Sequence, residues 1–199
     1  RAPLHLTSVG KLFLAFDDPQ RLRAYATRTG LPGHTQNSLT QLTVRYQPVT
    51  SQNRIPLVQN GNVDIECGST TNNALRAKDV AFAVNYFYAS SRLLVKKSGG
   101  VDKLADLAGK AVATTTGTTT FGQLRKLSLE KNLNLNVIPA KDHADGFLLL
   151  ESGRAQAFAM DDILLAGLML NAKNPDDYAI VGEPLQVEAY ACMLRKEDP

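Results

Sequence analysis

The sequence predicts an α/β fold with mostly parallel sheets, and three observations support this prediction. From residue 41 onward, strand-like stretches alternate with stretches of helical periodicity. The chain has 199 residues, 44% of them hydrophobic and 21% charged, which is typical of a globular protein with a sizeable core. A long extended segment over 80–97 and a late strand over 185–195 suit two crossings between lobes. We therefore expect one large domain or two lobes.

The first 40 residues differ in pattern from the rest. SVGKLFLAF (8–16) and PQRLRAYATRTG (19–30) predict two helices, the second ending at Gly30 with Pro32 just beyond. A polar loop, GHTQNSLTQ (33–41), follows. No strand is expected in this part.

The next elements are predicted from alternation and turn residues. LTVRYQPV (42–49) alternates apolar and polar residues as a strand does, and VDIE (63–66) reads as a second strand. Between them, IPLVQNG (55–61) predicts a short helix closed by Gly61. AFAVNYFYASSRLLVKK (81–97) predicts two extended segments with a break at Ala89 to Ser91.

From residue 101 onward, predicted helices and strands alternate regularly. The helices are expected at VDKLADLAG (101–109), FGQLRKLSLEKN (121–132), HADGFLLLESGR (143–154) and DDILLAGLMLNA (161–172). The strands are expected at KAVATT (110–115), LNVIPA (135–140), QAFAM (156–160), DYAIVG (177–182) and VEAYACMLR (187–195). This order favours βα units and a parallel sheet.

Charge and composition argue against several classes of protein. The formal net charge is 22 minus 19, or +3, and the basic residues are spread along the chain, so nucleic acid is not an expected partner. No apolar stretch approaches the roughly 18 residues of a membrane span, and RAPLHLTSVGK lacks the regions of a signal peptide. Residue 1 is not methionine, which is consistent with removal of a methionine by processing.

The cysteines and histidines do not predict a metal site. Cys67, Cys192 and the three lone histidines His5, His34 and His143 show no ligand spacing, so neither a metal nor another cofactor is expected. Both cysteines lie in strand-like segments and are either buried free thiols or one long-range disulfide. Such a disulfide would close a loop of 192 minus 67, or 125, residues and would imply an oxidising compartment.

The run TTTGTTT (114–120) lies where a predicted strand gives way to a helix. A glycine at this turn lets the first-turn amides of the helix face outward, so Gly117, Thr118 and Thr119 can form a bed for a carboxylate or phosphate. The simpler alternative is that Thr115 or Thr118 caps the helix and the other threonines fill the strand end. The run alone favours capping.

A second polar cluster, CGSTTNNALR (67–76), follows the strand VDIE. Ser69 and Thr71 can donate hydrogen bonds to a carboxylate that Arg76 holds through two parallel bonds. The alternative is a polar loop with a surface arginine.

Enzymatic motifs are not apparent in the sequence. GTTTFG (117–122) has neither the lysine nor the glycine spacing of a phosphate-binding loop, and no nucleophile elbow is present. We therefore do not expect an enzyme.

Several motifs in order resemble the glutamate/aspartate-binding proteins of bacterial amino-acid ABC transporters. They are SQNRIPLVQNG (51–61), DIECGSTTNNALR (64–76), GTTT (117–120), AKDHADGF (140–147), LESGRAQAFAMDDILLAG (150–167) and AYACMLRKEDP (189–199). The resemblance runs from about residue 42 to 199. It implies a two-lobed type II periplasmic-binding-protein fold that closes on its ligand by a hinge, a membrane permease as partner and a periplasmic location.

The resemblance also implies roles for individual residues. Arg76, Ser69 and Thr71 would hold the ligand's α-carboxylate, assisted from the other lobe by Thr118 and Thr119. Asp161 would take the α-ammonium, although Asp162 also matches the motif. The side-chain carboxylate would meet Ser51, Arg54 and His143. Cys67 and Cys192 fall where the family carries its disulfide.

Simpler interpretations of these residues remain open at this point. Asp161 and Asp162 directly precede ILLAGLML and can serve only as a helix cap. His143 likewise opens a predicted helix, and Arg54 can be a solvated helix residue.

The resemblance predicts a partial first lobe over 42–92 and 185–199, including hinge strands, and a complete second lobe over 93–184. The family's N-terminal strand and loop and its C-terminal helices have no counterpart in the sequence, so weakened binding is expected. Residues 1–41 instead resemble the start of the effector-binding domain of IclR-type transcription regulators. The alternative function is therefore a cytoplasmic effector-sensing fragment or a non-binding chimera.

Overall fold

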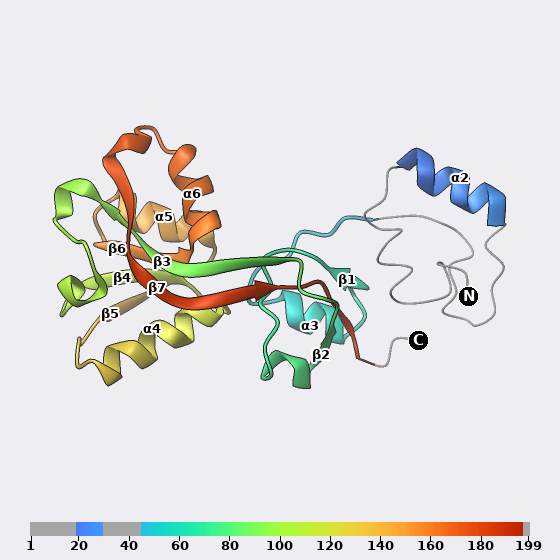
Figure 1. Ribbon diagram of the computed structural model, residues 1–199, viewed down its shortest axis with the longest axis horizontal. Coiled ribbons are helices and arrows are strands. Elements are labelled where there is room, and N and C mark those ends of the chain that lie inside the picture. Colours follow the sequence, from blue (N-terminus) through green and yellow to red (C-terminus); the bar gives the residue numbers. More distant parts are fainter. Residues whose placement is uncertain (1–18, 30–44, 197–199) are drawn as a thin grey trace.

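The structure is a computed structural model that describes residues 19–29 and 45–196. Its main feature is a pair of β-sheets joined by two long strands, β3 (Phe87–Lys96) and β7 (Tyr178–Tyr190), which run side by side (Figure 1). The part around the smaller sheet is called the first lobe here. The part around the larger sheet is called the second lobe.

The second lobe contains a five-stranded sheet in the order β5-β4-β6-β3-β7. Its other strands are β4 (Ala111–Thr115), β5 (Asn136–Ala140) and β6 (Ala157–Asp161). The strand β4 pairs in parallel with β5 and β6, whereas β3 pairs antiparallel with β6 and β7. The expected α/β fold is confirmed, but the sheet is mixed because the strand that enters the lobe and the strand that leaves it run in opposite directions.

Helices cover both faces of this sheet. The helix α4 (Thr119–Glu130) lies on one face, and α5 (His143–Glu151) and α6 (Asp162–Leu170) lie on the other (Figure 1). Successive residues of a strand point to opposite faces. Accordingly, Phe158 of β6 belongs to the hydrophobic core under α5 and α6, while Ala159 belongs to the core that contains Leu124 of α4.

The first lobe has a smaller, three-stranded antiparallel sheet in the order β1-β8-β2. Its strands are β1 (Ile65–Glu66), β2 (Val80–Phe82) and β8 (Met193–Arg195), and the helix α3 (Arg54–Gln59) packs beside them. Val58, Val80 and Met193 form its buried core. Because β8 follows β7 directly, the end of the described chain returns to the first lobe.

Short 3₁₀ helices and one further α-helix complete the described elements. The 3₁₀ helices are Arg76–Lys78, Lys97–Gly99, Leu104–Leu107 and Pro175–Asp177. The helix α2 (Pro19–Thr29) confirms the helix predicted over 19–30. The helix predicted over 8–16, the loop over 33–41 and residues 42–44 of the first predicted strand lie outside the described residues.

Three local predictions were wrong. Residues 45–50 form no strand, and Tyr46 and Pro48 are exposed there, where the proline cannot donate to a ladder. The break within 80–97 falls at residues 83–86, because β3 continues through Ala89 to Ser91 while paired with β7. The predicted helix over 101–109 forms only the 3₁₀ turn Leu104–Leu107.

The last two predicted strands have different boundaries in the structure. YAIVG and VEAY belong to one 13-residue strand, β7, despite the intervening Pro184. The strand predicted over 187–195 is interrupted at residues 191–192, after which β8 begins. Pro184 is tolerated because β7 is an edge strand with only β3 as a neighbour in the sheet. No strand lies on its other side that would need the N–H donor that proline lacks.

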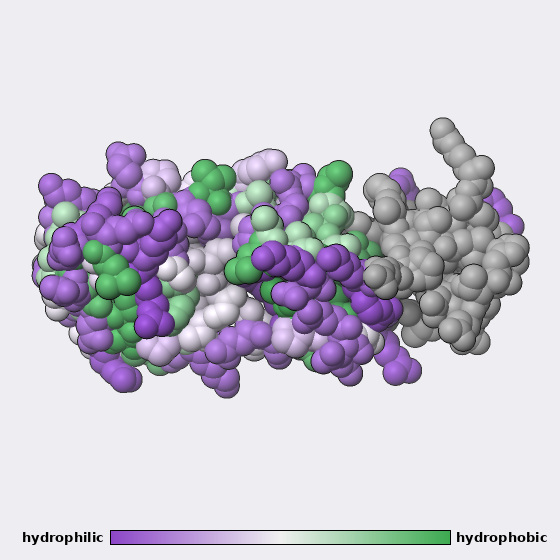
Figure 2. All heavy atoms as spheres, turned by 90° about the horizontal axis from the view of Figure 1, so that it is seen from below, coloured by the Kyte–Doolittle hydropathy of each residue, from purple (hydrophilic) through white to green (hydrophobic). Residues whose placement is uncertain are grey.

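On the face shown in Figure 2, polar side chains cover much of the described surface, and separate apolar patches lie on both lobes. Within residues 19–29 and 45–196, no helix combines the length and the apolar character needed to cross a membrane.

Candidate functional site

The threonine run forms the turn between β4 and α4. Thr118 is the helix N-cap: its Oγ1 accepts a hydrogen bond from Phe121 N at 3.2 Å and donates to Thr115 O at 2.7 Å. Thr114 and Thr115 are buried at the strand end, so the capping interpretation is confirmed for Thr118. This cap occupies the Phe121 amide, while the preceding first-turn amides of α4 have no partner inside the helix and remain suited to an anion.

Gly117 is the point at which the first lobe meets this turn. It has φ +77°, and a Cβ built on it would lie 2.6 Å from Ser51 O and 2.8 Å from Gln52 Cα. Its carbonyl accepts a hydrogen bond from Arg76 Nη2 at 3.2 Å, and Arg76 Nη1 donates to Thr71 O at 3.0 Å. Arg76 is 8% exposed, so the surface-arginine alternative is wrong.

Arg54, the first residue of α3, is buried rather than solvated. It is 5% exposed, and its Nη1 lies 3.9 Å from Glu66 Oε1. Its Nε atom has no hydrogen-bond partner in the part of the chain that the structure describes. Burial lowers the pKa of Arg54, and the nearby carboxylates of Glu66 and Asp161 offset this only partly. The guanidinium therefore has unused donors in a protected place.

Arg76 lies close enough to Arg54 for the two guanidinium groups to affect each other. Burial lowers the pKa of Arg76 to about 10, and the positive charge of Arg54 acts in the same direction. Both side chains stay protonated at neutral pH, so two cations occur together at the junction of the lobes.

Asp161 and Asp162, which the sequence could not separate, have different environments. Asp161 ends β6 and is 2% exposed, and its carboxylate accepts hydrogen bonds from Tyr190 Oη and Ser91 Oγ. It makes no side-chain cap bond to α6. Asp162 Oδ1 instead accepts from the backbone N–H of Ile163 at 2.8 Å. The side-chain cap interpretation therefore fails for Asp161, while Asp162, the first residue of α6, accepts from the first-turn amide of Ile163 and from Ser90 N at 3.3 Å.

Burial raises the pKa of Asp161 to about 6, although the hydrogen bond from Tyr190 works in the opposite direction. The pKa of Tyr190 is raised by burial and by the Asp161 charge, so its hydroxyl remains a donor. Asp161 is therefore a carboxyl group that a nearby cation would stabilise in its charged form.

Glu188 of β7 connects the threonines of both lobes. It is fully buried, and its Oε2 accepts from Thr71 Oγ1 at 2.5 Å and from Thr119 Oγ1 at 2.8 Å. Its Oε1 accepts from Ser91 Oγ and from Gln186 Nε2, both at 3.0 Å. Ser91 Oγ also lies 3.2 Å from Asp161 Oδ1, so its one proton can go to either carboxylate, and one network joins the candidate residues of both lobes.

His143 is the first residue of α5, next to the N-cap Asp142. Its Nδ1 lies 2.9 Å from Thr115 Oγ1, and burial followed by the Arg54 charge lowers its pKa. A neutral imidazole facing Arg54 can donate one N–H to an anion. The cap itself is Asp142, whose Oδ1 accepts from Asp145 N at 2.8 Å.

The structure thus brings together most of the residues predicted from the sequence. Contacts or charge interactions connect Arg54, Arg76, Thr71, Thr119, His143 and Asp161. Ser51 packs against Gly117 through its backbone. Ser69 is half-buried in the loop after β1, and its side chain makes no hydrogen bond among the described residues.

Sequence reasoning missed the buried residues that support this set. They are Glu66, Ser91, Thr120, Glu188 and Tyr190. The acidic residues in VDIE and VEAY were a usable signal, because a carboxylate in a strand-like, apolar context must find hydrogen bonds once buried.

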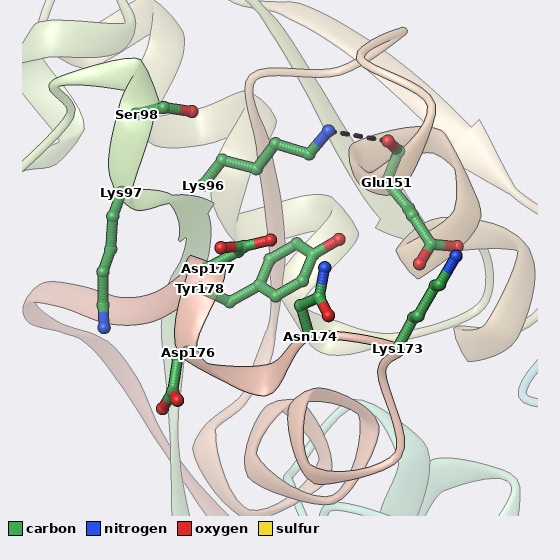
Figure 3. Close-up of a pocket in the computed structure, with 9 residues that line it drawn as sticks. All are labelled: Lys96, Lys97, Ser98, Glu151, Lys173, Asn174, Asp176, Asp177 and Tyr178. Carbon is green, nitrogen blue, oxygen red and sulfur yellow. Dashed lines mark hydrogen bonds between the residues drawn. The ribbon is translucent and has the colours of Figure 1, made fainter.

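The described residues also form a hollow away from this site, and they contain no cluster of metal ligands. A hollow of about 510 Å³ lies elsewhere on the second lobe, lined by three lysines, three acidic residues, Ser98, Asn174 and Tyr178 (Figure 3). Lys96 Nζ donates across it to Glu151 O at 2.7 Å. No group of three or more metal-ligating side chains occurs within residues 19–29 and 45–196.

The disulfide between Cys67 and Cys192 is present. It links the residue after β1 to the residue before β8, two strands that already pair. The disulfide interpretation of the two cysteines is therefore confirmed, and the free-thiol alternative is wrong.

Comparison with known proteins decides the family. Residues 34–199 match the bacterial extracellular solute-binding proteins, family 3. The chain belongs to this family. The glutamate/aspartate import solute-binding protein of Escherichia coli K12 is 56% identical over 158 residues, which are 79% of this chain and 52% of that protein. The L-glutamate/L-aspartate-binding protein of Pseudomonas aeruginosa is 54% identical over 161 residues, 81% of this chain and 53% of that protein.

A solved structure supports the family assignment. An ancestral arginine-binding protein bound to arginine matches with a TM-score of 0.72 and 28% identity over 79% of this chain and 69% of that chain. The chain spans about half the length of the curated relatives it matches. The IclR-type resemblance of residues 1–41 finds no support in these matches, and only 19–29 of that segment lies within the described residues.

Proposed function

We propose that this solute-binding chain holds an acidic amino acid, glutamate or aspartate, at the junction of its lobes and acts in ABC-transporter uptake rather than as an enzyme. The observation that carries the proposal is Arg54, a buried guanidinium whose Nε has no partner among the described residues. A buried cation is costly unless it is paired and hydrogen-bonded, so this side chain suits a bound anion.

The charges at the junction match the chemistry of a zwitterionic diacid. An acidic amino acid brings two carboxylates and one ammonium group. We assign one carboxylate to Arg76, with Ser69 and the first-turn amides at Thr118 and Thr119, and the other to Arg54, with Ser51 and His143. Asp161 takes the ammonium group because its buried carboxyl group gains most from a cation.

The relatives support the ligand class and the partner. Two of them are named for glutamate and aspartate, and one is named for import. By analogy, the partners are the amino acid and a membrane permease, and the location is extracytoplasmic, where the disulfide would persist. We further propose that residues 93–184 form the moving second lobe and that β3 and β7 form the hinge.

Calorimetric titration with L-glutamate, L-aspartate and L-glutamine tests this function. Wild-type protein should prefer the acidic ligands, and Arg54→Ala should lose about 2–5 kcal/mol of glutamate binding while losing less for glutamine. Arg154→Ala, which removes an exposed arginine, serves as the matched control and should bind as the wild type does. Failure of folded wild-type protein to bind any of the three ligands would overturn the proposal.

A further inference from the structure

Glu188 is the most completely hydrogen-bonded carboxylate of the junction, and the proposed function gives it no role. It is fully buried on β7 and has four donors within 3.0 Å, namely Thr71, Thr119, Ser91 and Gln186. An ionised carboxylate offers about four lone-pair positions. Thr71, Thr119 and Gln186 fill three of these positions, and the single Ser91 proton is shared between Glu188 and Asp161, so Glu188 has little capacity left for a ligand and acts through its neighbours.

The effect on the two threonines follows from the chemistry of a hydroxyl group. A threonine hydroxyl has one proton to donate and two lone pairs that accept. Thr71 and Thr119 both direct that proton to the same oxygen, Glu188 Oε2. Their remaining capacity is for accepting hydrogen bonds only. Such hydroxyls fit an ammonium group and repel a carboxylate oxygen.

The same hydrogen-bond network reaches the carboxylate proposed for the ammonium group. Ser91 Oγ lies 3.0 Å from Glu188 Oε1 and 3.2 Å from Asp161 Oδ1. Thr71 belongs to the loop of the first lobe, and Thr119 belongs to the first turn of α4 in the second lobe. Hydroxyl groups from both lobes are therefore connected to Asp161 through Glu188 and Ser91.

We propose that Glu188 is a positioning residue that fixes the hydroxyl protons of Thr71 and Thr119, so that both hydroxyls present lone pairs to the ligand's ammonium group. This inference rests on the proposed function and changes one sequence-based expectation. The ligand carboxylate is left to Arg76 and backbone amides, while the two threonine hydroxyls select for the amino group.

Glu188→Gln tests this role, because the amide keeps the shape but offers an N–H₂ donor in place of one carboxylate oxygen. The Kd values for L-glutamate and for glutarate, the same diacid without an ammonium group, are measured in both proteins. We expect glutamate binding to weaken by about tenfold or more and glutarate binding to change by less than about threefold. Equal losses for both ligands, or unchanged glutamate binding, would overturn the proposal.

Two further variants keep the test decisive. Glu183→Gln alters an exposed glutamate on the same strand and should bind both ligands as the wild type does. If glutarate binding is too weak to measure, Thr119→Val is combined with Glu188→Gln. If Glu188 acts through the Thr119 hydroxyl, the double variant should bind L-glutamate less than about twofold more weakly than Thr119→Val alone. If the fold-losses in glutamate affinity of the two single variants multiply in the double variant, the proposal is refuted. Absence of glutamate binding in the wild type would refute the proposed function itself.

Discussion

At the scale of single residues, Asp161 is a carboxyl group whose protonation depends strongly on its surroundings. Its pKa is about 6 in the folded protein, against an ordinary value of 3.8, because burial disfavours the charged carboxylate. The folded state therefore binds more protons than the unfolded state between about pH 4 and pH 6. In this window the free energy of unfolding falls as the pH rises.

We predict that this residue contributes a loss of about 3 kcal/mol in the free energy of unfolding as the pH rises from about 4 to about 6. Urea denaturation of ligand-free protein at several pH values measures it. Asp161→Asn should flatten the slope, and Asp162→Asn should leave it in place because Asp162 is less buried and accepts from the first-turn amide of Ile163. An unchanged slope in Asp161→Asn would contradict the raised pKa.

The contrast between these two aspartates shows what sequence can resolve at this scale. The motif located the acidic pair correctly, since DD directly precedes an apolar helix. Which of the two points inward depends on where β6 ends and how α6 starts, and boundaries are the least certain part of a pattern. Arg54 and Arg76 were likewise located, but their burial depends on residues far apart in the chain.

At the scale of elements, the turn between β4 and α4 controls how closely the lobes approach. Gly117 has positive φ, and the backbone of Ser51 and Gln52 occupies the space that a side chain at this position would need. An alanine there is strained by about 1–2 kcal/mol, as at any left-handed position. In addition, its methyl group would overlap atoms only 2.6 Å away, and rigid backbone cannot yield easily.

We predict that Gly117→Ala weakens L-glutamate binding by about tenfold or more, equivalent to about 1.4 kcal/mol, because the first lobe is pushed away from α4. Gly153→Ala is the matched control: Gly153 has φ +76°, but a Cβ added to it would have no other heavy atom within 4 Å among the described residues. Both variants carry the strain of a left-handed alanine, and Gly117→Ala should lose more stability in thermal melts because only its methyl group overlaps other backbone atoms. Equal ligand affinity in the two variants would show that the approach at Gly117 does not matter for binding.

Elements with strong local signals were predicted well, and elements defined by distant partners were not. The strands β4 to β6 and helices α4 to α6 follow from hydrophobic periodicity and caps. The length of β7 does not, because Gly182 and Pro184 look like strand breakers until pairing with β3 holds the edge strand together. Residues 45–50 alternate like a strand but pair with no neighbour among the described residues.

At the scale of the whole molecule, chain crossings determine the architecture. The sequence order of strands predicted parallel sheets, which is right for β4, β5 and β6. The first-lobe sheet and the pairs made by β3 are antiparallel, because the chain enters the second lobe on β3 and leaves it on β7. That reversal depends on which strands become neighbours, and local patterns do not encode it.

The disulfide closes the loop that these crossings create. Cys67 and Cys192 are 125 residues apart in sequence, and the whole second lobe lies between them. Cross-linking such a loop restricts the unfolded chain, and the chain-entropy model gives about 4–5 kcal/mol for this length. Most of the stabilisation therefore acts on the unfolded state, not on contacts at the cysteines.

We predict that replacing both cysteines by serine lowers the free energy of unfolding by about 4–5 kcal/mol, measured by urea denaturation with the slope fitted separately for each protein, since removing the cross-link lets the unfolded chain expand. Adding a thiol reductant to wild-type protein should reproduce the loss, and the double variant should not respond to reductant. The first lobe should lose structure earlier than the second, because its core of Val58, Val80 and Met193 is small while the five-stranded sheet has cores on both faces. Hydrogen exchange separates the lobes: equal protection in β8 and β6 after reduction would contradict this order of unfolding.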